Sequence, residues 1–406
     1  MQAKLAEFIK RKPESGELKA ILRSCVHCGF CTATCPTYQL LGDELDGPRG
    51  RIYLLKQMAE GQAIGRLTQL HLDRCLSCRS CETTCPSGVR YGRLLDIGRE
   101  MVDERVIRPV AERIKRKAIL SLFPYRRRFS LLMSMARRIK PLLPSALAER
   151  IPAKSDAGGW PEPRHARKML IFPGCVQPEL APSIDAAAAR VLDKQGISLV
   201  SVEHGGCCGA LPYHLSDRRR ALDFARQQID ACWQAIMEGA EAIVTTASGC
   251  GVMIKEYGEL LKDDRNYADK ARRVSALTKD LSEILSREDL SFTSSQKRRI
   301  AFHSPCTLQH GQQITGLVEA ILVQAGFQLT AVADGHLCCG SAGVYSLLQP
   351  ELAGRLRENK LNTLLQNQPD MVVTANIGCL VHLQLTGLAP IEHWIELLDE
   401  ALAESD

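Results

Sequence analysis

Eight of the 17 cysteines form two runs with the same spacing. Each run reads C-x2-C-x2-C-x3-C and is followed directly by a proline. The runs consist of Cys25, Cys28, Cys31 and Cys35, and of Cys75, Cys78, Cys81 and Cys85. Thiolates at this spacing are typical of proteins that hold four-iron clusters. The two runs therefore predict two [4Fe-4S] clusters and one-electron redox chemistry.

The runs resemble those of bacterial two-cluster ferredoxins, in which the fourth cysteine binds the cluster of the other run. That resemblance implies one cluster on Cys25, Cys28, Cys31 and Cys85, and a second on Cys75, Cys78, Cys81 and Cys35. Zinc sites and disulfides also use CxxC pairs. Neither alternative explains the third cysteine, the trailing proline or the duplication, so we expect clusters.

Eight of the other nine cysteines form a tandem repeat. Cys175, Cys207, Cys208 and Cys250 recur 129 to 131 residues later as Cys306, Cys338, Cys339 and Cys379, and the flanking text KMLIFPGC recurs as RIAFHSPC. These eight thiols are further candidate metal ligands for additional iron-sulfur clusters or for zinc. The alternative is that they are reduced thiols that pack as small apolar side chains. Cys232 has no counterpart and is predicted to lie in the core.

Each repeat alternates strands and helices. In the first repeat, strands are predicted over 169–172, 197–202 and 241–246, with a helix over 186–196. In the second, the same order is predicted over 300–303, 318–326, 327–332 and 371–375. This alternation predicts parallel sheets with helices on their faces. The cysteines follow the predicted strand ends, where open α/β sheets build their sites.

The repeats resemble the cysteine-rich CCG domains of heterodisulfide reductases and of the iron-sulfur subunits of several 2-hydroxyacid and glycerol-3-phosphate dehydrogenases. With the two cysteine runs and the text TCPTYQLLGDELDGPRGRIYL (34–54) in front, the whole chain resembles the iron-sulfur subunits of bacterial glycolate dehydrogenase, also called glycolate oxidase. One departure is clear. Heterodisulfide reductases end each repeat in CxxC, whereas this chain has Ala247 and Asn376 in place of the first cysteine.

The resemblance implies the electron-transfer subunit of an oxidoreductase complex that converts glycolate to glyoxylate, with no catalytic residue on this chain. Oxidation of a 2-hydroxyacid releases a hydride, and the chain has neither GxGxxG after a predicted strand nor GxxxxGK[ST]. The resemblance therefore implies FAD on partner flavoprotein subunits, and a relay through this chain toward the quinone pool. Three alternatives stay open: the same role in a lactate or glycerol-3-phosphate complex, a thiol/disulfide enzyme, and a redox sensor.

Basic and imidazole side chains near the thiols form another set of candidates. Arg49 and Arg51 either offset the charge of the thiolates or lie on the wet face of a helix that begins at Pro48. Imidazole replaces thiolate in some iron-sulfur centres. The histidines near the repeat cysteines are therefore candidate ligands, namely His204, His214, His303, His310 and His336. His27, between Cys25 and Cys28, is assigned no role.

A basic segment separates the two cysteine-rich parts. Residues 105–154 hold 14 Lys or Arg against two acids, more than the whole net charge of +6, and apolar stretches alternate with the basic ones. This pattern predicts amphipathic helices that bind an anionic membrane surface, at about 1 kcal/mol per basic residue. An acidic partner and a solvated connector are the alternatives.

Localisation and organisation follow from the same patterns. We find no apolar run that could span a bilayer and no signal peptide, and we expect a cytoplasmic protein held peripherally on the cytoplasmic face of the inner membrane, with no nucleic-acid partner. The predicted fold is mixed. An α-helical two-cluster ferredoxin domain occupies residues 15–105, a basic helical connector occupies 106–165, and a duplicated α/β CCG module with parallel sheets occupies 166–285 and 297–400.

Overall fold

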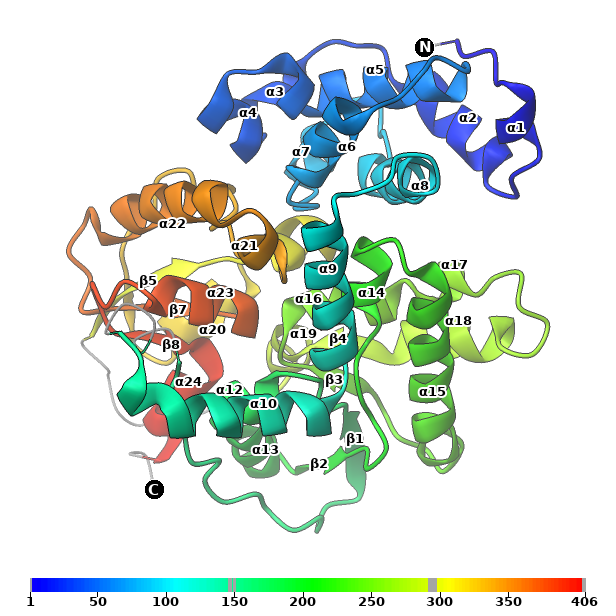
Figure 1. Ribbon diagram of the computed structural model, residues 1–406. Helices are drawn as coiled ribbons and strands as arrows, with labels where there is room; N and C mark the ends of the chain where they lie inside the picture. The colour runs from blue at the N-terminus through cyan, green and yellow to red at the C-terminus, as the bar shows by residue number, and fades with distance from the viewer. Residues whose placement is uncertain (1, 145–147, 149–150, 291–297, 404–406) are drawn as a thin grey trace.

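The computed structural model describes residues 2–144, 148, 151–290 and 298–403. A helical N-terminal domain lies above two α/β units in Figure 1, so the predicted fold class is confirmed. Small parts of the predicted connector and the first residue of the predicted second repeat, 297, lie outside the described residues.

The N-terminal domain is entirely helical within the described residues. Its elements are α1 (Glu7–Lys10), α2 (Ser15–Ser24), α3 (Phe30–Ala33), α4 (Pro36–Leu41), η1 (Glu44–Asp46), α5 (Pro48–Ala59), α6 (Arg66–Asp73), α7 (Ser80–Thr83) and α8 (Tyr91–Asp103). Leu22, Leu55 and Leu94 are fully buried between these helices. Gly98 lets α8 approach α5, because a Cβ there would lie 2.3 Å from a methyl carbon of Leu55.

The connector forms the predicted helices, α9 (Val110–Leu122) and α10 (Arg126–Ile139), followed by the turn η2 (Lys140–Leu142). Each helix buries one apolar side chain against the body, Ile119 on α9 and Phe129 on α10. Arg220 of the first repeat donates a hydrogen bond to the carbonyl of Leu120 (2.9 Å). Both helices run across the α/β units in Figure 1.

The two repeats have the same sheet topology. The strand orders are β2-β1-β3-β4 and β6-β5-β7-β8, with every neighbouring pair parallel. The strands are β1 (Arg167–Ile171), β2 (Ile197–Ser201), β3 (Ile243–Thr245), β4 (Thr278–Asp280), β5 (Arg299–His303), β6 (Gln328–Leu329), β7 (Met371–Thr374) and β8 (Ile391–His393). The sequence did not predict β4 and β8, and β6 is shorter than the predicted strand over 327–332.

Helices cover both sheets. In the first repeat they are α12 (Gln177–Leu180), α13 (Ser183–Lys194), α14 (Ala210–His214), α15 (Arg218–Met237), α16 (Ser248–Lys255), α17 (Tyr257–Leu260), α18 (Ala268–Leu277) and α19 (Leu281–Leu285). In the second they are the π-helical turn η3 (Thr307–Gly311), α20 (Leu317–Gln324), α21 (Tyr345–Leu348), α22 (Pro350–Leu365), α23 (Ile377–Gln384) and α24 (Trp394–Ala403).

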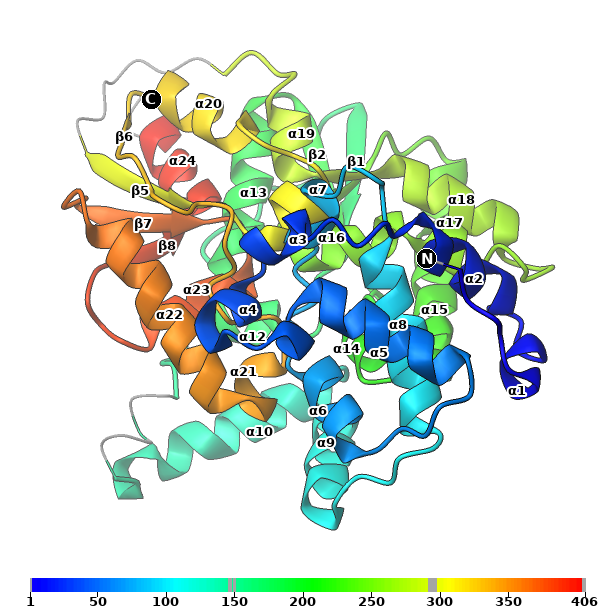
Figure 2. The ribbon, with the colours of Figure 1, turned by 90° about the horizontal axis from the view of Figure 1, so that it is seen from above.

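The repeats, although separate in sequence, share one hydrophobic core that runs from β1 and α13 to α24. Ser183 on α13 donates to Glu396 on α24 (2.6 Å), and Arg190 forms an ion pair with Asp399 (2.6 Å). Figure 2 shows the N-terminal helices lying over both repeats, with α22 beside α4. The duplicated module is therefore one packed body that supports the helical domain.

Candidate metal centres

The first hollow in the N-terminal domain is lined by Cys25, Cys28, Cys31 and Cys85, which form the first predicted ligand set. The hollow holds about 430 Å³ of space free of atoms, counting the part open to solvent. The chain after α2 reverses through left-handed residues, among them Gly29 (φ 87°), where a Cβ would lie 3.0 Å from Arg49. This turn lets the three thiols of one run converge.

The second hollow is lined by Cys35, Cys75, Cys78 and Cys81, which form the second predicted set. Its space is about 300 Å³, and Cys81 borders both hollows. The hydroxyl of Tyr91, which also borders both, donates to the Cys75 sulfur (3.7 Å). The crossed ligand assignment stays a prediction, and this grouping of the thiols is compatible with it.

The donor chemistry of the two hollows suits a positively charged inorganic group. Burial raises the pKa of Cys31 to about 11 and raises those of Cys78 and Cys81 well above the ordinary range. Bare thiolates would therefore be unfavourable at neutral pH, whereas iron binding displaces the thiol protons. The residues thus fit two [4Fe-4S] clusters.

Arg51 lies at the wall of the second hollow and is completely buried. Its Nε donates to the carbonyl of His71 (2.7 Å), its terminal nitrogens donate to Thr37 (3.2 Å), and it pairs with Asp46 (3.4 Å). The interpretation of Arg51 as a wet-face arginine was therefore wrong, because the helix turns this residue toward the thiols. Arg49 is partly exposed and pairs with Glu44.

In the first repeat, a third hollow of about 480 Å³ is lined by the thiols of Cys175, Cys208 and Cys250. These residues follow β1, β2 and β3, the edge of the sheet at which the sequence placed them. Cys207 interacts with Cys175 and Cys208 without bordering the hollow. Hydrogen bonds with Cys207 and Cys250 lower the pKa of Cys208.

In the second repeat the thiols lie against one another. The sulfurs of Cys306 and Cys338 are 3.8 Å apart. A ring nitrogen of His303 and the sulfurs of Cys339 and Cys379 lie within 4.8 Å of one another. Cys232, outside both sets, is fully buried and donates to the carbonyl of Ile229 (3.4 Å), as expected of a core residue.

Two of the five candidate histidines, His214 and His310, have side-chain partners other than thiols. His310 contacts the Thr83 hydroxyl (2.9 Å) and the carbonyl of His336 (2.9 Å), and His214 contacts Asp96 (3.2 Å). Among the histidines near the repeat cysteines, only His303 joins a group of thiols within the described chain. The sequence offered no reason to prefer one of the five histidines, and the structure distinguishes His303 as the one that lies beside two thiols.

The second hollow lies against the second repeat, a relationship that the sequence did not predict. Cys78 packs against a small buried cluster that includes Leu76, Cys306 and Cys338. The hydroxyl of Tyr345 in the same cluster donates to the carbonyl of Arg74 (3.1 Å). The sequence carries no signal for this contact, because Cys306 and Cys338 lie more than 200 residues after Cys78 in the chain.

Comparison with known families places this architecture in a class. A 4Fe-4S dicluster domain matches residues 21–89, and a cysteine-rich domain matches residues 169–255 and 300–384. The chain is therefore an iron-sulfur protein that joins a dicluster domain to tandem cysteine-rich domains. It is 53% identical to the glycolate oxidase iron-sulfur subunit of Escherichia coli K12, over 99% of both chains. The chain belongs to the family of glycolate oxidase iron-sulfur subunits, as the resemblance implied.

Other proteins resemble the chain at lower sequence identity. The probable glycolate oxidase iron-sulfur subunit of Bacillus subtilis 168 is 29% identical over 97% of this chain and 96% of its own length. Lactate utilization protein A of Bacillus licheniformis is 25% identical over 53% of this chain and 90% of its own length. A solved structure of a hypothetical protein from Helicobacter pylori aligns with a TM-score of 0.51 at 13% identity, over 99% of this chain and 76% of that one. That likeness concerns the fold alone.

Proposed function

We propose that this chain is the electron-transfer subunit of a glycolate-oxidising complex. The observation that carries the proposal is the grouping of eight thiols around two adjoining hollows, in a chain 53% identical to a glycolate oxidase iron-sulfur subunit. Cys25, Cys28, Cys31 and Cys85 would hold one [4Fe-4S] cluster, and Cys35, Cys75, Cys78 and Cys81 the other. Such clusters supply one-electron redox chemistry. FAD on a partner flavoprotein takes the hydride, and a quinone is the final acceptor.

The face around Cys28 is the proposed contact with the flavoprotein. Cys28 is the exposed member of its set. Its neighbours Val26 and Phe30 are 67% and 61% exposed, which places two apolar side chains in water beside the first hollow. Exposed apolar side chains next to a redox site favour a protein partner, because contact removes them from water. The second hollow, by contrast, is covered by the second repeat.

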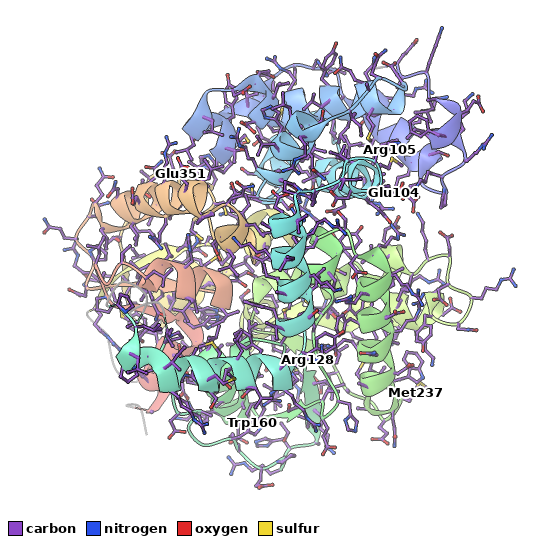
Figure 3. The ribbon with its side chains drawn as sticks, in the orientation of Figure 1. Glu104, Arg105, Arg128, Trp160, Met237 and Glu351 are labelled. Carbon is purple, nitrogen blue, oxygen red and sulfur yellow. The ribbon has the colours of Figure 1, made fainter. Side chains whose placement is uncertain are left out.

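The connector is the proposed contact with the membrane. Leu131, Met135 and Ile139 are exposed at four-residue intervals along α10, and Leu142 follows in the next turn at 86% exposure. Exposed arginines such as Arg128, labelled in Figure 3, flank this stripe. A helix with an apolar stripe and basic flanks lies at an anionic lipid surface. Among the helices of the described chain, none combines the length and apolar character needed to cross a bilayer.

The hollow in the first repeat favours a third cluster. It is comparable in size to the two hollows of the helical domain, and three thiols border it. Cys175, Cys208 and Cys250 would hold the cluster, with Cys207 beside them. With three [4Fe-4S] clusters we expect about twelve irons per chain, whereas the helical domain alone gives about eight.

The test is anaerobic purification of the complex, followed by iron analysis and turnover with glycolate, lactate and glycerol 3-phosphate. We expect glycolate to reduce both the flavin and a quinone analogue in the wild type. In a Cys28→Ser, Cys78→Ser variant, glycolate should still reduce the flavin while the quinone analogue stays oxidised. Preferred turnover of lactate would move the proposal to a lactate complex. Unchanged quinone reduction in the variant would overturn the relay.

A second variant tests the docking face separately. Phe30→Glu should weaken co-purification with the flavoprotein while the iron content stays at the wild-type value, because residue 30 lies outside both ligand sets. Trp160→Glu is the control, because Trp160 is another exposed aromatic residue. It belongs to the connector (106–165) and lies outside both cysteine runs. Equal effects of the two substitutions would contradict this docking face.

A further inference from the structure

His303 has an unusual environment for a histidine. It is the last residue of β5, is only 2% exposed, and neither ring nitrogen has a hydrogen-bond partner in the described structure. Leaving a buried polar group unpaired is costly, so buried imidazoles normally find partners. His393, at the same edge of the same sheet, contacts the carbonyl of Thr246 (3.0 Å). Both ring nitrogens of His303 are therefore available to bind a metal ion.

Two thiols face the His303 ring. A ring nitrogen of His303 and the sulfurs of Cys339 and Cys379 all lie within 4.8 Å of one another, and all three residues are buried. Around one tetrahedral zinc, Zn–S bonds of about 2.3 Å and Zn–N bonds of about 2.0 Å hold the donor atoms about 3.5 to 3.8 Å apart. The three donors are thus close to the spacing that a single ion requires.

The scaffold holds these donors on adjacent strands. β5 and β7 pair in parallel with His303 opposite Thr374, and the Thr374 hydroxyl donates to the carbonyl of His303 (3.0 Å). Cys379 lies in the first turn of α23, which follows β7. Asn376 donates a hydrogen bond to the Cys379 sulfur (3.5 Å). Hydrogen bonds of this kind orient metal ligands from outside the coordination sphere.

The first repeat lacks this arrangement. The residue that corresponds to His303 is Phe172, and its side chain borders the hollow shared by Cys175, Cys208 and Cys250. The second repeat instead brings an imidazole up to two thiols and holds Cys306 and Cys338 in contact. The two repeats therefore differ at this position: the thiols of the first repeat border a hollow, whereas those of the second repeat lie close to one another and to an imidazole.

We propose that His303, Cys339 and Cys379 bind a single divalent transition-metal ion of the zinc class, at a site distinct from the iron-sulfur centres. The thiol of Cys338 interacts with those of Cys306 and Cys339 and is the candidate for the fourth ligand. The ion would link the ends of β5 and β7 to the loop that carries Cys338 and Cys339. Because Cys78 packs against Cys306 and Cys338, the ion would also brace the second repeat where it covers the second hollow.

The test uses the full chain, purified anaerobically, with zinc and iron measured together. We expect about one zinc per chain in the wild type. We expect less than a tenth of that in His303→Phe, the residue of the first repeat, with the iron content and the EPR spectrum of the reduced clusters unchanged. Cys379→Ser should also lose the zinc. Cys232→Ser, the matched control for a buried thiol, should keep it.

A spectroscopic probe keeps the proposal testable if a variant fails to fold. Wild-type protein prepared with Co²⁺ in place of Zn²⁺ should show thiolate-to-cobalt absorption at one equivalent, and excess Zn²⁺ should remove it. Absence of both zinc and cobalt binding in the wild type would overturn the proposal. A loss of about four irons in His303→Phe would also overturn it, because the site would then hold a cluster.

Discussion

Arg79 and Glu256 form a bidentate ion pair that joins the second cysteine run to the residue after α16 of the first repeat, with Nη2 and Oε2 3.1 Å apart. The Arg79 side chain is 16% exposed, and its backbone has a left-handed conformation (φ 60°) between Cys78 and Cys81. The loop that presents the thiols of the second hollow is therefore anchored to one repeat, while its neighbour Cys78 packs against the other.

The first prediction concerns this ion pair. Arg79→Met and Glu256→Gln should each lower the thermal unfolding midpoint, with a coupling of about 1.5 kcal/mol or more in a double-mutant cycle, because a partly buried hydrogen bond between charged groups is lost. Arg272→Met is the control, since Arg272 pairs with Asp269 at a highly exposed position and should change stability by less than about 0.5 kcal/mol. Equal effects at the two sites would contradict an anchoring role for Arg79.

The second prediction separates the two cysteine runs. If the fourth cysteine crosses over, Cys85→Ser should eliminate the EPR signal of the cluster bound by Cys25, Cys28 and Cys31. Cys35→Ser should eliminate the signal of the other cluster. The reason is that Cys85 borders the first hollow and Cys35 the second.

The control for each of these variants is the substitution of another cysteine that borders the same hollow. Cys31→Ser should reproduce the spectrum of Cys85→Ser, and Cys78→Ser should reproduce that of Cys35→Ser. EPR of the dithionite-reduced protein measures both comparisons. If Cys85→Ser instead matched Cys78→Ser, each run would hold its own cluster and the crossed assignment would be wrong.

The sequence predicted the parts of the molecule that depend on local spacing. Cysteine runs, the tandem repeat and the connector helices are all defined by neighbours along the chain, and the strands with continuous apolar runs were found for the same reason. The strands β4 and β8 were missed because each has three residues, TKD and IEH, in which no apolar period can be recognised.

The features that the sequence left undecided depend on contacts across the fold. Arg51 lies within hydrogen-bond distance of Thr37 and His71, and no periodicity indicates that a helix turns an arginine inward. His303 and His310 are both near Cys306 in sequence, but only His303 faces thiols, because the parallel order of β5 and β7 places Cys379 beside it. Spacing identifies ligand types, and topology decides which of them meet.

The third prediction concerns Asp185 on α13. Burial raises the pKa of Asp185 to about 6, against opposing hydrogen bonds from Thr246 and Gln177 (2.6 Å each). The folded protein therefore binds a proton that the unfolded chain, with a pKa of 3.8, releases, and stability falls as pH rises from about 4 to about 6. Above pH 6 the full cost is about 3 kcal/mol.

Asp185→Asn should remove this cost, since the amide oxygen can accept the same two hydrogen bonds. We expect the variant to unfold at a higher temperature than the wild type at pH 8, and we expect this advantage to shrink as the pH is lowered to 5. Thermal unfolding followed by circular dichroism across this range measures it. An advantage that is independent of pH would show that Asp185 is not the titrating group.

The fourth prediction tests the exposed stripe on α10 against lipid. Leu131→Glu with Met135→Glu should weaken binding to vesicles of phosphatidylglycerol and phosphatidylcholine by tenfold or more, because each apolar side chain contributes about 1.5 to 3 kcal/mol when it leaves water. Added salt should weaken the binding of the wild type, because the flanking arginines are exposed.

Met237→Glu is the matched control for the lipid experiment. Met237, at the end of α15, is 70% exposed and lies away from α10 in Figure 3. The control introduces one of the two charges on a methionine of similar exposure, 70% against 64% for Met135, so it should leave vesicle binding unchanged if the stripe itself contacts the membrane. If the α10 variant bound vesicles as well as the control, while the complex with the flavoprotein dissociated, the stripe would be a protein contact and the membrane attachment would lie on another subunit.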